Sequence, residues 1–299
     1  MPAYSALESI LPVAMSNLPP SRTVRPPMFA GKLYPADAQV LTAQVDAALA
    51  VANQNPEKPL IPYVRTLLVP HDHYQHVLPI LAEGYRHVES ARYELIVFVA
   101  PTVDKFNRLV ISGYGYFGTP LGNIELSDYA RNELCDEDDD FFISELGLPK
   151  GSSIEIQLPL LQRTIGKHYP FRIVPLLIGN QTFDLCNEAA AALSEILTSK
   201  NALVIAVNNF NLSPEHTPLV EEFMAGIREH DYGALIRMTV LHGETLGSGL
   251  GAWAIAARVS HSLGARNFHL LSQQSNAEAG KIFISACYTH YLLGVRSEE

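Results

Sequence analysis

Cysteine is scarce in this sequence, and the spacing of its few cysteines excludes two kinds of stabilised fold. The 299 residues contain three cysteines, Cys135, Cys186 and Cys287, and no C-x-x-C pair. An odd number of widely separated cysteines is not a disulfide framework, and a structural zinc site would need closely spaced thiolates. The sequence therefore indicates a reducing compartment, and we expect a cytoplasmic protein.

Basic residues are also in short supply, which argues against nucleic acid as a partner. Lys and Arg total 21 against 31 Asp and Glu, so the formal net charge is −10. Such a surface repels phosphate backbones. The acidic run CDEDDD (135–140) lacks the alternating carboxylates and central glycine of a calcium loop, so we expect a solvated acidic loop there.

Long apolar runs and a recognisable leader are missing too. No stretch approaches the roughly 20 apolar residues that cross a bilayer. The first residues, MPAYSALESILPVAMSNLPP, have no basic start and include Glu8 and Pro12, unlike a signal peptide. Residues 1–27 are rich in proline and small residues without a clear period. We therefore expect an N-terminal arm over residues 1–27 and one α/β domain over residues 28–299.

What the sequence does contain is an alternation of strand and helix patterns. Short apolar runs predict strands at 64–69, 94–100, 171–178, 202–207, 267–272 and 281–288. Helical patterns cover 38–52 (after the N-cap residue Asp37), 77–89, 154–165, 183–199, 217–230 and 250–263. Wholly apolar strands that alternate with helices predict a single mixed, mostly parallel sheet with helices on both faces.

Ligands bind such sheets outside the carboxyl ends of the strands, and histidines gather at one of these ends. The segment PHDHYQH (70–76) follows the first strand. On an extended segment, residues i and i+2 point the same way, so His71 and His73 could face one divalent ion of iron, copper or zinc. Asp104 or Glu155 would then add a carboxylate. The competing interpretation is a polar pocket in which His71 is a hydrogen-bonded remnant of a former site and His73 and His76 lie at the rim.

The end of the fourth strand and a later glycine-rich segment each leave two interpretations open. Asn208, Asn209 and Asn211 either form a neutral hydrogen-bonding pocket or serve the turn chemistry that asparagine favours after a strand. Ser248 in TLGSGLG is typical of a helix start, where a serine caps free N–H groups. The same segment lacks the lysine of a nucleotide-binding loop.

Five sequence blocks follow one another along the chain: RPPMFAGKLYPAD (25–37), PHDHY (70–74), TPLGNIEL (119–126), SSIEIQLPLLQ (152–162) and IVPLLIGN (173–180). With a late sheet strand they cover nearly the whole chain. In this order they resemble the Memo family, which is also called AmmeMemoRadiSam system protein B. The resemblance implies a fold similar to that of class III extradiol ring-cleavage dioxygenases, which are non-haem iron enzymes, with a pocket lined by histidines and a cysteine.

At the pocket positions that the resemblance implies, this sequence departs from the family pattern. These positions are His71, Tyr74, Val103, Ser152, Asn209, Leu212 and Ser248. His71 and Tyr74 are kept. Valine, serine and leucine replace family histidines, asparagine replaces an aspartate, and serine replaces the cysteine. Valine and leucine cannot ligate a metal, and asparagine carries no charge. The resemblance therefore implies a divergent member with a degenerate metal site.

From this pattern we expect a non-catalytic binding or accessory protein, a pseudoenzyme, with no cofactor. Its partners, as the resemblance implies them, would be a radical SAM enzyme and an AMME-region protein. The alternative is a metal-dependent, dioxygenase-like oxidoreductase with a site rebuilt around His71 and His73. The fold hypothesis further predicts that His71, Val103, Asn209 and Ser248 converge on one pocket.

Overall fold

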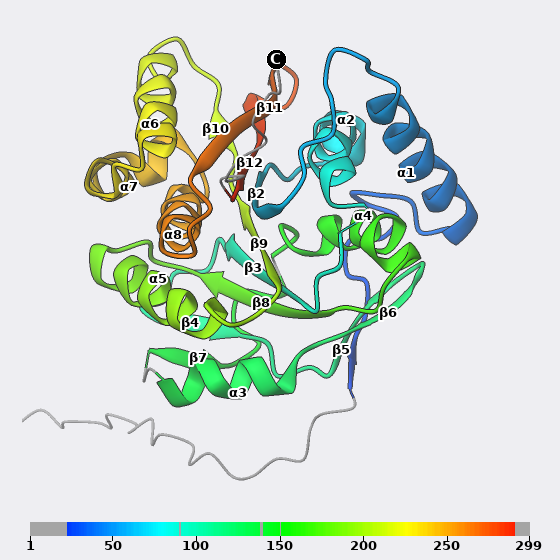
Figure 1. Ribbon diagram of the computed structural model, residues 1–299, viewed down its shortest axis with the longest axis horizontal. Helices are drawn as coiled ribbons and strands as arrows, with labels where there is room; N and C mark the ends of the chain where they lie inside the picture. The colour runs from blue at the N-terminus through cyan, green and yellow to red at the C-terminus, as the bar shows by residue number, and fades with distance from the viewer. Residues whose placement is uncertain (1–22, 90, 138–139, 150, 291–299) are drawn as a thin grey trace, which may run out of the picture.

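The computed structural model of the protein describes residues 23–89, 91–137, 140–149 and 151–290 (Figure 1). The helices are α1 (Ala38–Asn53), α2 (Tyr74–Tyr85), α3 (Asp128–Glu137), α4 (Leu158–Arg163), α5 (Phe183–Leu197), α6 (Thr217–Glu229), α7 (Tyr232–Leu246) and α8 (Leu250–Ser262). Short 3₁₀ turns are η1 (Arg86–Val88), η2 (Glu155–Gln157) and η3 (Ile165–Lys167). The strands are β1 (Val24–Arg25), β2 (Val64–Val69), β3 (Leu95–Pro101), β4 (Leu109–Ile111), β5 (Tyr116–Thr119), β6 (Gly122–Glu125), β7 (Phe141–Ile143), β8 (Arg172–Ile178), β9 (Ala202–Val207), β10 (Phe210–Asn211), β11 (Asn267–Asn276) and β12 (Lys281–Thr289).

The main sheet is mixed and has a parallel centre. In the described part of the chain its nine strands run in the order β10-β12-β2-β9-β3-β8-β4-β7, with β11 paired to β12. The neighbours β2, β9, β3 and β8 are parallel, whereas β12 is antiparallel to β2 and β4 is antiparallel to β8. A smaller sheet consists of β1, β5 and β6. This arrangement confirms the predicted α/β fold.

Each face of the main sheet carries its own hydrophobic core, and β3 shows why. Its side chains alternate, because successive residues of a strand point to opposite faces. Val97 and Val99 pack into the core with α5 to α8, whereas Ile96 and Phe98 pack into the core with α1, α2 and α4. Helices therefore cover both faces of the sheet, as Figure 1 shows. A strand that is buried on both faces is apolar throughout, which is the pattern in the sequence.

The predicted elements are present with small shifts at their ends. All six predicted strands form, although β11 continues to Asn276, beyond the predicted end at 272. The helix predicted over 77–89 begins earlier, at Tyr74, and its last turn is η1. The pattern over 154–165 is broken into η2, α4 and η3. Asp37 caps α1 as predicted, because its side chain accepts from the N–H groups of residues 39 and 40.

Two helices were not predicted, and one of them corrects the expected acidic loop. The run CDEDDD was expected to be a loop, but Cys135 and Asp136 lie in the last turns of α3. This helix is polar, and Ala130 and Leu134 are the residues that anchor it in the core. The second helix is α7. Of the expected N-terminal arm, residues 1–22 lie outside the described residues, and residues 24–25 pair with β5 as β1.

Candidate functional site

The carboxyl ends of the parallel strands bring three sequence-predicted residues together. His71 follows β2, Asn209 follows β9, and Ser248 lies just before α8. β2 and β9 are adjacent parallel strands, so the segments that follow them start side by side. The bond from the Asn208 N–H to the Val69 carbonyl, at 3.0 Å, extends this pairing past the end of both strands. The fold therefore places residues from three distant parts of the chain at one edge.

Asn209 is bonded twice to the backbone of His71. Its side-chain Oδ1 accepts from the His71 N–H at 2.9 Å, and its Nδ2 donates to the His71 carbonyl. The Asn209 side chain is buried, and the two residues are 138 positions apart in the sequence. The Asn209 amide thus satisfies the backbone N–H and the backbone carbonyl of His71, which lies beyond the end of β2. Within the sheet, a neighbouring strand would satisfy such groups.

Ser248 completes this cluster. Its Oγ lies 3.3 Å from His71 Nε2 and accepts from the Asn209 N–H at 3.2 Å. Its own N–H donates to the Asn209 carbonyl at 3.0 Å. Because the Asn209 N–H already uses the hydroxyl oxygen as an acceptor, the hydroxyl proton is free to point at the His71 ring. We call His71, Asn209 and Ser248 the strand-end cluster.

Asn208 holds the segment that carries Ser248. Its Oδ1 accepts from the Gly249 N–H at 2.7 Å, and the Asn208 side chain is buried. Its Nδ2 has no hydrogen-bond partner among the described residues. Gln181 holds the other side of the same segment, because its Nε2 donates to the Ser248 carbonyl at 2.8 Å and its Oε1 accepts from the Gly251 N–H at 2.7 Å. Two side-chain amides therefore fix the position of Ser248.

The His71 imidazole is neutral at physiological pH. Burial by the surrounding protein lowers its pKa from 6.5 to about 4, and Lys281 acts in the same direction, whereas Asp72 opposes the shift. The cause is desolvation, which penalises the charged imidazolium. A neutral ring has one donor nitrogen and one acceptor nitrogen, so it bonds Ser248 in either sense. The strand-end cluster has no net charge of its own at pH 7.

Hydrogen bonds of Tyr74 and Gln157 support the segment that carries His71. Tyr74 begins α2, is buried, and donates its hydroxyl to the Ile156 carbonyl at 2.7 Å. Gln157 Nε2 donates to the Pro70 carbonyl at 2.9 Å, and Gln157 Oε1 accepts from Tyr85 at 3.0 Å. Both contacts tie the η2 segment to the residues around His71. Gln157 and Gln181 were missed as supporting residues, although each lies in or beside a predicted helix or strand, in the runs IEIQLP and GNQTF.

Glu155, one of the sequence-predicted metal ligands, is fully engaged elsewhere. Its carboxylate accepts from Arg25 Nη1 at 2.5 Å, from the backbone N–H groups of Met28 and Phe29 at 3.1 and 2.8 Å, and from the Tyr34 hydroxyl at 2.8 Å. Glu155 is 1% exposed. These four donors occupy both oxygens, so the carboxylate anchors residues 25–34 rather than facing the strand-end cluster.

The other predicted site residues lie apart from the cluster. His73 is exposed at the N-terminus of α2, where its ring lies against that of His76 with centroids 5.9 Å apart, and among the described residues its side chain forms no hydrogen bond with the cluster. Val103 extends from the loop after β3 and is 69% exposed, and the expected convergence is therefore limited to His71, Asn209 and Ser248. Asp104 lies on the same loop, where its N–H donates to Thr102 Oγ1 at 3.4 Å.

Ser152 and Leu212 have structural surroundings. The carbonyl of Ser152 accepts from the Ile156 N–H at 3.2 Å and begins the turn into η2. Leu212 is partly buried against the hydrophobic core on the α5 to α8 side. The positions that the family resemblance assigned to one pocket are therefore spread along the carboxyl ends of the strands. Direct hydrogen bonds join three of them, His71, Asn209 and Ser248.

The donor groups at this edge do not fit a divalent metal. Among the described residues, no three His, Cys, Asp or Glu side chains lie close enough to hold one ion. The strand-end cluster offers one imidazole, one hydroxyl and an amide that is already bonded, whereas metal sites in proteins draw on several imidazoles, thiolates or carboxylates. We therefore derive no reaction step through a metal here.

All three cysteines, Cys135, Cys186 and Cys287, are free thiols. Burial raises the pKa of Cys186 and of Cys287 to about 12, so neither thiol forms a reactive thiolate at neutral pH. In the ranges that the structure describes, no helix has the length and apolar character needed to span a bilayer.

Similarity to known proteins covers most of the chain. A family model described as Memo-like protein matches residues 25–288. A MEMO1 family protein of Nitrosopumilus maritimus is 23% identical over 271 residues, which cover 85% of this chain and 94% of the relative. A MEMO1 family protein of Sulfolobus acidocaldarius is 27% identical over 273 residues, 86% of this chain and 94% of the relative.

A solved structure shares the fold. It is the crystal structure of an uncharacterized protein from Escherichia coli K12, with a TM-score of 0.50 and 12% sequence identity, and the match covers 75% of this chain and 99% of that one. At this identity the likeness concerns the fold alone.

Proposed function

The chain belongs to the Memo-like protein family, and from that premise we propose that it is a non-catalytic accessory protein of the cytoplasm whose strand-end cluster binds a neutral polar ligand. In this proposal the metal pocket expected from the family is degenerate. The cluster keeps the position of the pocket at the carboxyl edge of the sheet but has lost its charge.

The observation that carries the proposal is the pair of bonds between Asn209 and the His71 backbone. One bond needs an acceptor on residue 209, and the other needs a donor. An ionised carboxylate only accepts, so an aspartate could make the first bond and not the second. The amide is thus committed to joining two segments, and it is not available as a base or as a metal ligand.

The groups that remain for a ligand are uncharged. They are the neutral imidazole of His71, the hydroxyl of Ser248 and the buried Nδ2 of Asn208, which lacks a partner among the described residues. Each good hydrogen bond from such groups contributes roughly 0.5–1.5 kcal/mol. They do not ionise a bound water as a metal would, so they favour binding over hydrolytic or oxidative chemistry.

The arrangement of the predicted ligands does not support the dioxygenase-like alternative. It required His73 and either Asp104 or Glu155 to join His71 around one ion. His73 packs on His76, and the Glu155 oxygens are taken by four donors. We therefore do not propose it as a second function.

Metal analysis and oxygen uptake test the proposal. Protein purified without a histidine tag should contain well under one equivalent of iron, copper or zinc by elemental analysis. It should also consume no oxygen with catechol and added ferrous iron. The comparison uses His71→Ala, with the exposed His168→Ala as the matched control. Stoichiometric metal, or iron-dependent oxygen uptake, that persists in His168→Ala and is lost in His71→Ala would overturn the proposal.

The family resemblance also suggests the partners of the accessory role. We propose that the protein associates with a radical SAM enzyme and an AMME-region protein. Mixing the purified proteins and analysing them by size-exclusion chromatography with light scattering tests this. Separate elution of all components at micromolar concentrations would count against such a complex.

A further inference from the structure

A polar cavity lies at the end of the sheet opposite to the strand-end cluster. It has a volume of about 430 Å³ and is lined by residues at the amino ends of β2 and β9, including Arg65 and Asn201, and by the C-terminal ends of α5 and α8. Arg65 and His71 lie at the two ends of β2, roughly 20 Å apart at a rise of about 3.3 Å per residue. The cavity is therefore separate from the proposed ligand site.

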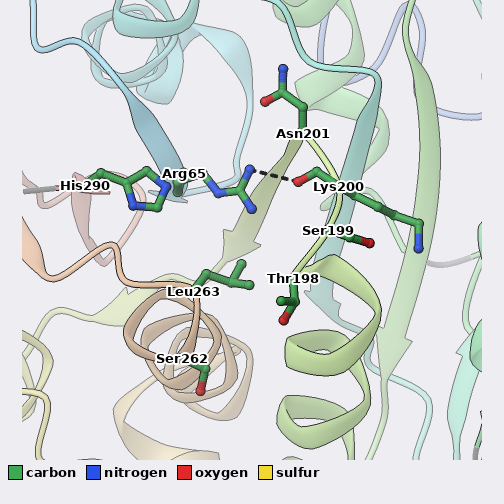
Figure 2. Close-up of a pocket in the computed structure, with 8 residues that line it drawn as sticks. All are labelled: Arg65, Thr198, Ser199, Lys200, Asn201, Ser262, Leu263 and His290. Atoms are coloured by element: carbon green, nitrogen blue, oxygen red, sulfur yellow. Dashed lines mark hydrogen bonds between the residues drawn. The ribbon is translucent and has the colours of Figure 1, made fainter.

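Arg65 brings a positive charge to this cavity without an acidic partner. Among the described residues no carboxylate forms an ion pair with it, and its Nε has no hydrogen-bond partner. Its Nη1 donates to the Lys200 carbonyl at 3.1 Å, as Figure 2 shows, and its Nη2 donates to the Leu197 carbonyl at 3.4 Å. The guanidinium has more N–H donors than these two bonds use, so it can still bind an acceptor.

The other charged side chain at the cavity does not compete for an anion. In Figure 2 the Lys200 side chain extends away from Arg65. Its ammonium donates to Glu133 Oε2 at 2.8 Å and to the Ile196 carbonyl at 2.9 Å. The Glu133 charge is therefore neutralised by Lys200. Lys200 contributes its backbone carbonyl to the cavity rather than its charge.

Two helices end at the cavity, and their carbonyls could repel an anion, but most of these groups are already bonded. At the end of α5, Arg65 binds the carbonyl of Leu197, the last residue of the helix. At the end of α8 the chain turns back at Gly264, which has a positive φ of 79°. There the N–H groups of residues 263–265 bond the carbonyls of residues 259–261. This is the usual way in which a helix end loses its free acceptors.

The rest of the lining includes His290 and three hydroxyl-bearing residues, Thr198, Ser199 and Ser262. Desolvation and the charge of Arg65 lower the pKa of His290, whereas a hydrogen bond with the Gly264 backbone raises it. A bound anion would oppose the effect of Arg65. Ser199 and Ser262 add exposed hydroxyl groups, and Leu263 gives the cavity an apolar wall. The net charge of −10 acts over a longer range, and physiological salt screens it beyond about 8 Å.

We propose that this cavity binds a small oxyanion, either a phosphate or a carboxylate group, through the guanidinium of Arg65. His290, which lies beside the guanidinium, provides a further hydrogen-bonding group. Planar N–H groups of arginine match the oxygens of such anions, and these charge-assisted bonds are stronger than neutral ones. The site is independent of the proposed function, since it uses none of the residues of the strand-end cluster.

Anion titration tests the proposal with two readouts. Inorganic phosphate and acetate are titrated separately into the full-length protein at constant, physiological ionic strength, with calorimetry to detect binding and NMR of the His290 ring to measure its pKa. We expect saturable binding of at least one of the two anions at one site, together with a higher His290 pKa in the complex. Absence of saturable binding by both anions, or an unchanged His290 pKa in the complex, would overturn the proposal.

Variants assign the binding to the cavity. Arg65→Met should weaken the binding about tenfold or more, because a bond to a charged group is lost. Arg237→Met, which removes an exposed arginine on α7, should bind as the wild type does. Melting curves verify that each variant is folded. If Arg65→Met does not fold, His290→Ala replaces it, since His290 is exposed and its loss should also weaken binding. Binding of equal strength in the cavity variant and in Arg237→Met would contradict the assignment.

Discussion

Nη1 of Arg25 lies 2.5 Å from Oε2 of Glu155, and both side chains are buried although they stand 130 positions apart in the sequence. Arg25 also donates to the Leu148 carbonyl at 3.2 Å and lies 5.0 Å above the ring of Phe117. Glu155 in turn accepts from residues 28, 29 and 34. The pair therefore fastens the first described segment of the chain to η2, whose last residue, Gln157, supports the strand-end cluster.

Breaking this pair should be costly. Glu155→Gln removes the negative charge and leaves Arg25 buried without a counter-ion. The expected loss of unfolding free energy is about 3–5 kcal/mol, the usual result of removing one partner of a buried ion pair. Urea unfolding followed by circular dichroism measures it.

An exposed ion pair gives the matched control for Glu155→Gln. Arg172 and Glu125 lie 3.0 Å apart with side chains that are 58% and 48% exposed. Glu125→Gln should therefore cost less than about 1 kcal/mol. Equal losses in the two variants would show that burial does not set the strength of the Arg25–Glu155 pair.

Asn209→Asp should weaken the junction between the segments after β2 and β9. The aspartate keeps the size of the side chain, but it cannot donate to the His71 carbonyl, which is then left without its partner. We expect a loss of about 1–3 kcal/mol, the cost of an unsatisfied buried polar group. Chemical denaturation measures it. Asn123→Asp, at an exposed position of β6, is the control and should stay within about 0.5 kcal/mol of the wild type. A wild-type-like Asn209→Asp would mean that the donor on residue 209 contributes nothing.

His71 should make the protein less stable in mild acid. The pKa of His71 is about 4 in the folded protein, below its ordinary value of 6.5. The unfolded chain therefore binds the proton more tightly, and stability falls as the pH decreases from 6.5 towards 4. Above pH 6.5 the ring is neutral in both states and contributes no pH dependence.

The comparison of wild type with His71→Ala isolates this effect, because His87 also has a pKa lowered to about 4 and is present in both proteins. At pH 7.5 we expect His71→Ala to cost little, about 0.5 kcal/mol, since the hydrogen bond of the ring to Ser248 is long, at 3.3 Å. Between pH 6.5 and 4 the wild type should lose stability faster than the variant. Parallel curves of unfolding free energy against pH would contradict the lowered pKa.

Patterns among neighbouring residues predicted most of the longer strands and helices, whereas elements with a weak or short local pattern were missed. Strands such as VRTLLV and ALVIAV are largely or wholly apolar because both faces of the sheet are covered, so their composition identifies them. The helix α3 has a polar sequence with Ala130 and Leu134 as its buried anchors, and such a weak apolar face is hard to distinguish from a loop. The strands β4 to β7 have three or four residues each, too few to show a period.

The candidate site could be located but its bonding could not. The rule that ligands bind at the carboxyl ends of parallel strands led to His71 and Asn209, and both lie there. The partner of each polar group is far away in the sequence, however. Glu155 was a reasonable metal ligand as a carboxylate in the block IEIQLP, and nothing local reveals that Arg25 takes its charge. Likewise, the commitment of Asn209 to the His71 backbone is a tertiary contact.

The backbone of Gly249 lies very close to β9, with no room for a side chain. A Cβ added at Gly249 would lie 2.2 Å from the Val207 carbonyl oxygen and 3.0 Å from Pro101 Cγ. The backbone oxygen cannot move without disturbing β9, so Gly249→Ala should displace the segment that carries Ser248. We expect a loss of about 1–3 kcal/mol, as for other overpacked sites.

Gly243→Ala is the control, because a Cβ there meets no atom within 4 Å and the residue lies in α7. That change should stabilise the protein by up to about 1 kcal/mol, since alanine favours a helix over glycine. Thermal melting should therefore show shifts of opposite sign in the two variants, and a Gly249→Ala protein as stable as Gly243→Ala would show that the segment before α8 can shift freely, so that Ser248 is not held against His71 and Asn209.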